Sequence, residues 1–205
     1  MELQENWDKM QIILHRINTR QGLVNTPREF GVEVDIRSEG KRLIIGHAPF
    51  IGGEDFLQWI SVYDHGTLIL NVKEEGLEEE LVSIMSKHQI EDFFFLDQSF
   101  PFLLKTVETG ETRCAVRISE YEDINTALNL IGKIQWVWVD CFTGFPLTAK
   151  QAEILQKKGG FKLCFVSPEL QGRNDKKDIA NFKKEIEMKG IKGDAVCTKY
   201  PDLWV

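Results

Sequence analysis

Short apolar runs recur along the chain and alternate with segments of helical or turn-like pattern. The runs are rich in β-branched and aromatic residues and are bounded by polar or glycine-containing stretches, which is typical of buried strands. They lie at Gln11–His15, Val32–Ile36, Thr67–Val72, Phe93–Leu96, Cys114–Ile118, Trp136–Asp140, Lys162–Val166 and Ala195–Thr198. A further run at Arg42–Gly46 follows the hairpin-like segment 38–41 and extends the second strand. The pattern therefore predicts eight strands.

Several segments between these runs carry apolar residues at helical spacing. In the segment 76–85, Leu77, Leu81 and Ile84 fall on one face at i, i+4 and i+7. The other predicted helices are Glu54–Tyr63, Ile124–Ile131, Thr148–Lys157 and Asp175–Met188. Thr148 is a suitable N-cap and Gly159 a suitable end for the third of these. Strands that alternate with helices indicate a parallel sheet.

Eight such units in one chain predict an α/β fold, namely a compact (β/α)8 barrel of the TIM type. The chain has 205 residues, which is short for a fold of about 250 residues. We therefore expect short or irregular helices after the first and fourth strands, and no final outer helix after the last strand. An open doubly wound sheet would need a glycine-rich phosphate loop after an early strand, and the sequence holds no such motif. Residues 1–205 are predicted to form a single domain.

Composition narrows the function classes. Hydrophobic residues make up 42% and charged residues 28%, as in globular proteins, and the net charge is -7. This charge disfavours nucleic-acid binding, and the apolar runs are shorter than the roughly 20 residues of a membrane span. Residues 1–10 hold no apolar signal core. The four cysteines form no CxxC pair and mostly lie in apolar runs, so we expect a reduced, cytoplasmic protein. The oligomeric state is not predicted.

Polar residues at strand ends are the candidates for chemistry, because barrel enzymes place their active sites there. The first three strands supply the densest set, consisting of His15, Arg16, Glu33, Asp35, His47, Asn71 and Lys73. Later strands offer the more scattered set of Asp97, Arg117, Glu120, Asp140 and Glu169. Each residue alone has a structural explanation: a strand-end histidine is commonly hydrogen-bonded in place, and a strand-end lysine commonly reaches solvent.

The chemistry of the first set is coherent when its members are taken together. Glu33 and Asp35 are two residues apart on one strand, so their carboxylates face the same side and repel unless a cation or hydrogen bonds compensate. Carboxylate and amide oxygens suit Mg²⁺ or Ca²⁺. Two histidines can act as general base and general acid near neutral pH, and a cation with nearby basic side chains would hold a phosphate. This set indicates phosphodiester cleavage.

The same residues resemble the glycerophosphodiester phosphodiesterase family, within the wider group of phosphatidylinositol-phospholipase-C-like barrels. The matching stretches are IILHRIN (12–18), FGVEVDIRS (30–38), RLIIGHAP (42–49) and LILNVK (68–73), in the family's order. A terminal YPD follows the last strand. The resemblance implies a metal-dependent hydrolase that cleaves a glycerol- or sugar-containing phosphodiester by attack of a neighbouring hydroxyl, with a small phosphodiester as its substrate.

By this resemblance His15 would deprotonate the attacking hydroxyl and His47 would protonate the leaving oxygen. Glu33, Asp35 and Asn71 would bind the divalent metal, Mg²⁺ or Ca²⁺. Arg16 and Lys73 would bind the substrate phosphate.

Two departures from the family pattern leave alternatives open. Ile17 stands where a glycine usually follows His-Arg, and Asn71 stands where a third metal-binding carboxylate is expected, a charge that Asp97 could supply. One alternative is a catalytically weak or inactive barrel that binds an anionic sugar-phosphate ligand. Another is a sugar-phosphate aldolase or isomerase, for which Lys199 is the available Schiff-base lysine.

Overall fold

The computed structural model describes residues 10–173 and 175–205. These residues divide into two compact units, one of residues 13–114 and one of residues 10–12 with the described part of 115–205. The prediction of a single domain stays a prediction, and the prediction that no signal core lies in 1–10 falls almost entirely outside the described residues. In the part of the chain that is described, no helix combines the length and apolar character needed to cross a membrane.

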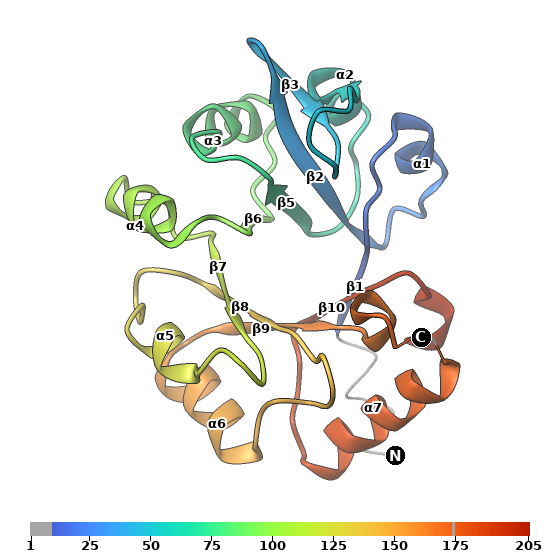
Figure 1. Cartoon of the computed structure of the whole chain (residues 1–205), viewed down its shortest axis with the longest axis vertical. Helices are drawn as coiled ribbons and strands as arrows, with labels where there is room; N and C mark the ends of the chain where they lie inside the picture. Colours follow the sequence, from blue (N-terminus) through green and yellow to red (C-terminus); the bar gives the residue numbers. More distant parts are fainter. Residues whose placement is uncertain (1–9, 174) are drawn as a thin grey trace. The chain divides into compact units, whose positions relative to one another are not determined.

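The unit of residues 13–114 is built on parallel strands in the order β1, β2, β5, β6, and β3 and β4 extend it as antiparallel neighbours of β2. Its strands are β1 (Gln11–Leu14, which begins in the other unit), β2 (Gly31–Glu39), β3 (Arg42–Ile45), β4 (Glu54–Asp55), β5 (Leu68–Val72) and β6 (Phe93–Leu96). Its helices are α1 (Arg20–Asn25), α2 (Phe56–Ile60), α3 (Glu78–Lys87) and α4 (Phe100–Glu108). Figure 1 labels these elements in chain order.

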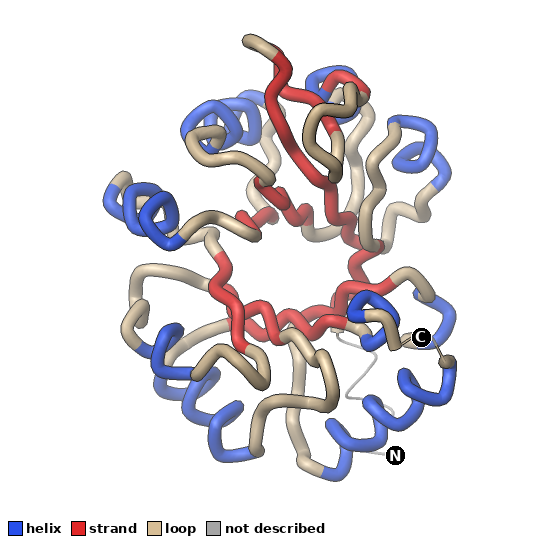
Figure 2. The backbone as a smooth tube through the Cα atoms, in the orientation of Figure 1, coloured by secondary structure: helices blue, strands red, loops and turns tan. Residues whose placement is uncertain are grey.

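The unit that contains residues 115–205 follows the same plan, with parallel strands in the order β7, β8, β9, β10. Its elements are β7 (Ala115–Ile118), α5 (Ile124–Leu128), β8 (Trp136–Val139), α6 (Ala149–Glu153) with a π-helical end η2 (Ile154–Lys158), β9 (Lys162–Val166), η3 (Pro168–Gln171), α7 (Lys176–Met188), β10 (Ala195–Thr198) and the 3-10 helix η4 (Pro201–Leu203). Within each unit the helices lie along one side of that unit's strands (Figure 2).

The strand predictions are confirmed, because every predicted run contains a strand. These strands are apolar enough to be buried on both faces, as parallel strands require; β5, β6, β8 and β10 are buried along their whole lengths. The predicted extension of the second strand is the antiparallel pairing of β2 with β3, from Ile36 opposite Ile45 to Glu39 opposite Arg42. All the cysteine side chains are also buried.

Each of the five predicted helical segments contains a helix, namely α2, α3, α5, α6 with η2, and α7. Leu77, Leu81 and Ile84 are buried, and Thr148 caps α6 in a capping box with Gln151. The helix predicted at Glu54–Tyr63 is shorter, because Glu54 and Asp55 pair with β3 and the Asp55 side chain caps α2.

The expectation of a short or irregular helix after the fourth predicted strand is wrong. Helix α4 is regular and amphipathic over Phe100–Glu108, and Pro101 lies in its first turn, where proline is tolerated. The expectation of a short helix after the first strand is confirmed by α1. After β10 the described residues hold only the short η4.

Candidate functional site

The first side of the site is the sharp turn that follows β1. Arg16 has a φ of 56°, a left-handed conformation that costs a non-glycine residue roughly 1–2 kcal/mol. This conformation directs the Arg16 backbone N–H to Oε2 of Glu33 at 2.6 Å. The imidazole Nε2 of His15 lies 3.9 Å from the same oxygen. The turn therefore brings the predicted base and an amide donor to the first buried carboxylate.

Glu33 is fully buried within β2. Its Oε1 accepts a hydrogen bond from Nδ2 of Asn71 on the neighbouring strand β5, at 2.7 Å. Burial, with the negative charge of Asp35 adding to it, raises the pKa of Glu33 to about 7. Glu33 is thus a carboxyl group whose negative charge is poorly compensated by the side chains around it.

Asp35, two residues along β2, is also fully buried but is much better compensated. Its Oδ1 lies 3.2 Å from Nζ of Lys73, and its Oδ2 accepts a hydrogen bond from Nδ2 of Asn18 at 2.7 Å. Asn18 also accepts from the Asp35 backbone N–H at 3.0 Å. Burial alone would raise the pKa of Asp35, but the Asn18 hydrogen bond and the Lys73 charge outweigh it and hold the pKa below its usual range. Sequence analysis missed Asn18, which stands inside the matching IILHRIN stretch.

His47 reaches the same carboxylate from the loop that follows β3. Its Nδ1 lies 3.3 Å from Oδ1 of Asp35, and its Nε2 lies 3.0 Å from Nη2 of Arg16. A guanidinium can only donate, so Nε2 accepts and the proton of the neutral ring sits on Nδ1, facing Asp35. Arg16 also approaches Asp35 directly, with Nε 3.6 Å from Oδ2. His47 and Arg16 are both substantially exposed, so a substrate could contact them from solvent.

Lys73 bridges two carboxylates. Its Nζ lies 3.2 Å from Asp35 and 3.0 Å from Oδ2 of Asp97, at the end of β6. Asp97 has a left-handed φ of 64°. Sequence analysis offered Asp97 as a metal-binding charge, whereas the structure places it in an ion pair with Lys73.

The residues Glu33, Asp35 and Asn71 fit a divalent cation by the chemistry of the donors they leave unsatisfied. Oδ1 of Asn71 is buried and has no hydrogen-bond partner among the described residues. In the same part of the chain no lysine or arginine forms an ion pair with Glu33, whose nearest basic group is His15 at 3.9 Å. An oxygen-preferring cation would satisfy both. Within 10–173 and 175–205 no group of three or more His, Cys, Asp or Glu side chains is arranged to hold a metal ion. The candidate ligand set is therefore two carboxylates and an amide.

The later strand-end residues have partners within the other unit. Asp140 is fully buried and accepts hydrogen bonds from Arg117 and Gln171. Glu120 closes the loop after β8 by accepting from the backbone N–H groups of residues 142–144. Glu169 accepts from Ser167, from the Thr198 hydroxyl and from the Lys199 backbone. These contacts give each residue a structural role.

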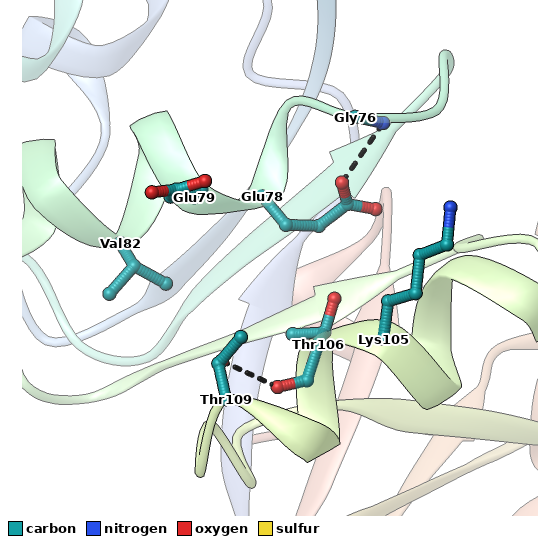
Figure 3. Close-up of a pocket in the computed structure, with 7 residues that line it drawn as sticks. All are labelled: Gly76, Glu78, Glu79, Val82, Lys105, Thr106 and Thr109. Carbon is teal, nitrogen blue, oxygen red and sulfur yellow. Dashed lines mark hydrogen bonds between the residues drawn. The ribbon is translucent and has the colours of Figure 1, made fainter.

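A separate cavity of about 490 Å³ lies between α3 and α4, away from the residues described above. In Figure 3 Glu78 points into it, and its carboxylate accepts a hydrogen bond from the Gly76 backbone at 3.0 Å. Gln98 is a further donor to Glu78, at 3.3 Å. The cavity holds none of the predicted site residues.

The order of strands and helices, with polar residues gathered where strands end, defines an α/β protein of the (β/α)8 TIM-type class. Two solved structures share this fold over almost the whole chain. A glycerophosphodiester phosphodiesterase from Agrobacterium tumefaciens matches with a TM-score of 0.61 and 12% identity, over 95% of this chain and 97% of that one. A glycerophosphoryl diester phosphodiesterase from Parabacteroides distasonis matches with a TM-score of 0.64 and 12% identity, over 96% of this chain and 86% of that one.

No protein-family model matches the chain, and no curated protein matches it significantly. The structural likeness confirms at the level of the fold the resemblance that the sequence motifs indicated. At this sequence identity it shows the fold alone.

Proposed function

We propose that this protein is a metal-dependent phosphodiester hydrolase acting on a small glycerol- or sugar-containing phosphodiester. The observation that carries the proposal is the arrangement around Asp35, which lies within 3.3 Å of His47 and Lys73 and next to the buried Glu33 and Asn71. Anion binding alone requires no histidine, whereas cleavage requires proton transfers to and from oxygen. Nucleic-acid binding and membrane insertion are not part of this proposal.

In this mechanism the chain's own residues bind the phosphate and move the protons. His15 accepts the proton of a hydroxyl group beside the phosphate as that oxygen attacks phosphorus. Arg16 leaves Nε2 of His47 and binds a phosphate oxygen, which its partly exposed guanidinium can reach from solvent. Once Arg16 has left, His47 takes up a proton from solvent at Nε2 while Asp35 holds Nδ1, and it then gives that Nε2 proton to the leaving oxygen.

Glu33, Asp35 and Oδ1 of Asn71 would hold the divalent cation, Mg²⁺ or Ca²⁺. When bound, the cation would stabilise the negative charge that develops on the phosphate oxygens. Lys73 keeps the Asp35 side of the site compensated and contributes positive charge toward the phosphate. Its bridging position makes it a weaker phosphate ligand than Arg16.

The test is turnover of a panel of glycerol- and sugar-containing phosphodiesters, followed by phosphorus NMR with and without Mg²⁺ or Ca²⁺. We expect metal-dependent turnover that falls on the order of 10²–10⁴-fold in His15→Ala. His88→Ala is the matched control, because His88 is exposed at the end of α3. Turnover that is unchanged in His15→Ala would refute the mechanism.

A second candidate is a catalytically weak barrel that binds an anionic sugar-phosphate. It is favoured by the Asn71 side chain, whose amide donates a hydrogen bond to Oε1 of Glu33. A carboxylate at position 71 would instead add a third negative charge to the metal site. Calorimetry with glycerol 3-phosphate distinguishes the two: binding without turnover on any panel substrate supports the second candidate.

A further inference from the structure

One guanidinium connects the backbone of two site residues that come from different parts of the chain. Arg37 lies two residues after Asp35 on β2 and so shares its face. Its Nη2 and Nε donate to the carbonyl oxygen of His47 at 3.0 and 3.3 Å, and its Nη1 donates to the carbonyl oxygen of Lys73 at 3.3 Å. His47 follows β3 and Lys73 follows β5.

The backbone at His47 needs this support because the sheet has already ended there. The pairing of β2 with β3 ends with Ile36 opposite Ile45, and the Gly46 N–H donates to the Asp35 carbonyl at 3.0 Å. His47 lies beyond these ladder bonds, in a loop where Phe50 is fully exposed and has a left-handed φ of 63°. The two hydrogen bonds from Arg37 therefore fix the carbonyl of a residue that the sheet does not hold.

Arg37 is itself held in place. Its Nη1 lies 3.9 Å from Oε1 of Glu74, and the Glu74 carboxylate is fixed by the Ser38 backbone N–H and hydroxyl at 2.8 and 2.7 Å. The side chain is 17% exposed and borders a hollow of about 420 Å³. The planar guanidinium of an arginine in this position can donate hydrogen bonds to two carbonyl oxygens at once. The single ammonium of a lysine cannot do this with the same geometry.

We propose that Arg37 is a positioning residue, which sets the distance between His47 and Lys73 by binding both backbones. It touches no reacting atom and acts through those two residues. This inference rests on the proposed function in so far as His47 and Lys73 act on a substrate. The geometric claim, that Arg37 orients the His47 ring, can be tested without turnover.

The test compares Arg37→Ala and Arg37→Lys with Arg42→Ala. Arg42 is on the same hairpin and carries the same charge, but it pairs with Glu39 at the exposed edge. The first readout is kcat and KM on the best panel substrate. The second is the nitrogen-15 NMR signal of the His47 ring, which can be assigned from a His47→Gln spectrum because the chain has 4 histidines.

We expect kcat/KM to fall on the order of 10²-fold in Arg37→Ala, mainly through kcat, because displacement of a catalytic group by about 1 Å costs this much. Arg37→Lys should recover part of the loss, and Arg42→Ala should stay within about twofold of wild type. The His47 ring signals should shift in Arg37→Ala and not in Arg42→Ala.

Unchanged His47 signals and kcat/KM in a folded Arg37→Ala protein, measured well below its unfolding temperature, would overturn the proposal. If Arg37→Ala does not fold, unchanged His47 signals and an unchanged kcat/KM in Arg37→Lys would overturn the proposal. If wild type shows no turnover but the ring signals shift as expected, the proposed function fails while the positioning role of Arg37 stands.

Discussion

Replacing Asn71 by aspartate tests whether the site needs a cation. In the wild type, Nδ2 of Asn71 donates to Oε1 of Glu33 at 2.7 Å. Asn71→Asp removes this donor, and a hydrogen bond to a charged group contributes about 1.5–3 kcal/mol. It also places a carboxylate oxygen against a buried carboxyl group. At that separation two unit charges repel by roughly 6 kcal/mol at an effective dielectric constant of about 20.

The full repulsion is an upper limit, because the two groups can share a proton or move apart. We therefore expect Asn71→Asp to lower the free energy of unfolding by about 3–5 kcal/mol at about pH 8 with a chelator present. The loss should shrink as the pH falls. The native variant retains a shared proton that the unfolded chain releases, so its stability decreases as pH rises.

The assay is urea unfolding followed by the fluorescence of the 5 tryptophans, at about pH 8 and about pH 5.5. Adding millimolar Mg²⁺ or Ca²⁺ should stabilise Asn71→Asp more than wild type, because the variant offers the cation a third carboxylate. Asn25→Asp, at an exposed position at the end of α1, is the control and should change stability by less than about 0.5 kcal/mol. If Asn71→Asp in chelator is as stable as wild type at about pH 8, the account of Glu33 as an undercompensated buried carboxyl group is wrong.

Two further predictions concern parts of the fold outside this pair of residues. Partial burial would raise the pKa of Glu120, but backbone hydrogen bonds from Thr143 and Gly144 outweigh it and lower the pKa to about 2. Glu120→Gln should therefore reduce the free energy of unfolding at neutral pH. The difference from wild type should disappear as the pH falls from about 4.5 to about 2. Equal unfolding midpoints at neutral pH would contradict this. A Cβ at Gly53 would lie 1.8 Å from the carbonyl oxygen of Ile45, so Gly53→Ala should lower the free energy of unfolding by more than about 2 kcal/mol in denaturant titrations. Gly144→Ala, which meets open space, is its control and should behave like wild type.

The strands could be predicted because buried parallel strands are marked by composition alone. Runs such as Phe93–Leu96 and Trp136–Val139 are buried along their whole lengths, and no partner needs to be known for such a run to favour a strand. Helix α4 was expected to be short or irregular because 205 residues are few for eight strand–helix units, but it is regular over Phe100–Glu108, with Pro101 in its first turn, where proline is tolerated.

Spacing along a single strand predicts which candidate residues share a face, but not which residues of different strands lie next to each other. Glu33 and Asp35 share a face because they are two residues apart, and so do Asn71 and Lys73. That Asp35 pairs with Asn71 depends on the register between β2 and β5, which no local pattern fixes. The contacts of Asn18 and Asp97 depend on the turns at Arg16 and Asp97, where φ is left-handed. Those of Arg37 depend on where the chain after β3 and after β5 places the carbonyls of His47 and Lys73, so the sequence could not assign them.

The two buried carboxylates differ because of their depth in the sheet. Asp35 is level with Asn71 in the register, next to the strand ends from which Lys73 and His47 extend. Glu33 is two residues further back, roughly 6–7 Å along the strand, and is paired in register with the apolar Ile69. Lys73 and Arg16 therefore compensate the charge of Asp35, whereas Glu33 accepts hydrogen bonds from an amide and a backbone N–H. In the proposed function, Asp35 would therefore orient the acid–base groups, and Glu33 and the Oδ1 of Asn71, which has no hydrogen-bond partner among the described residues, would be the main cation ligands.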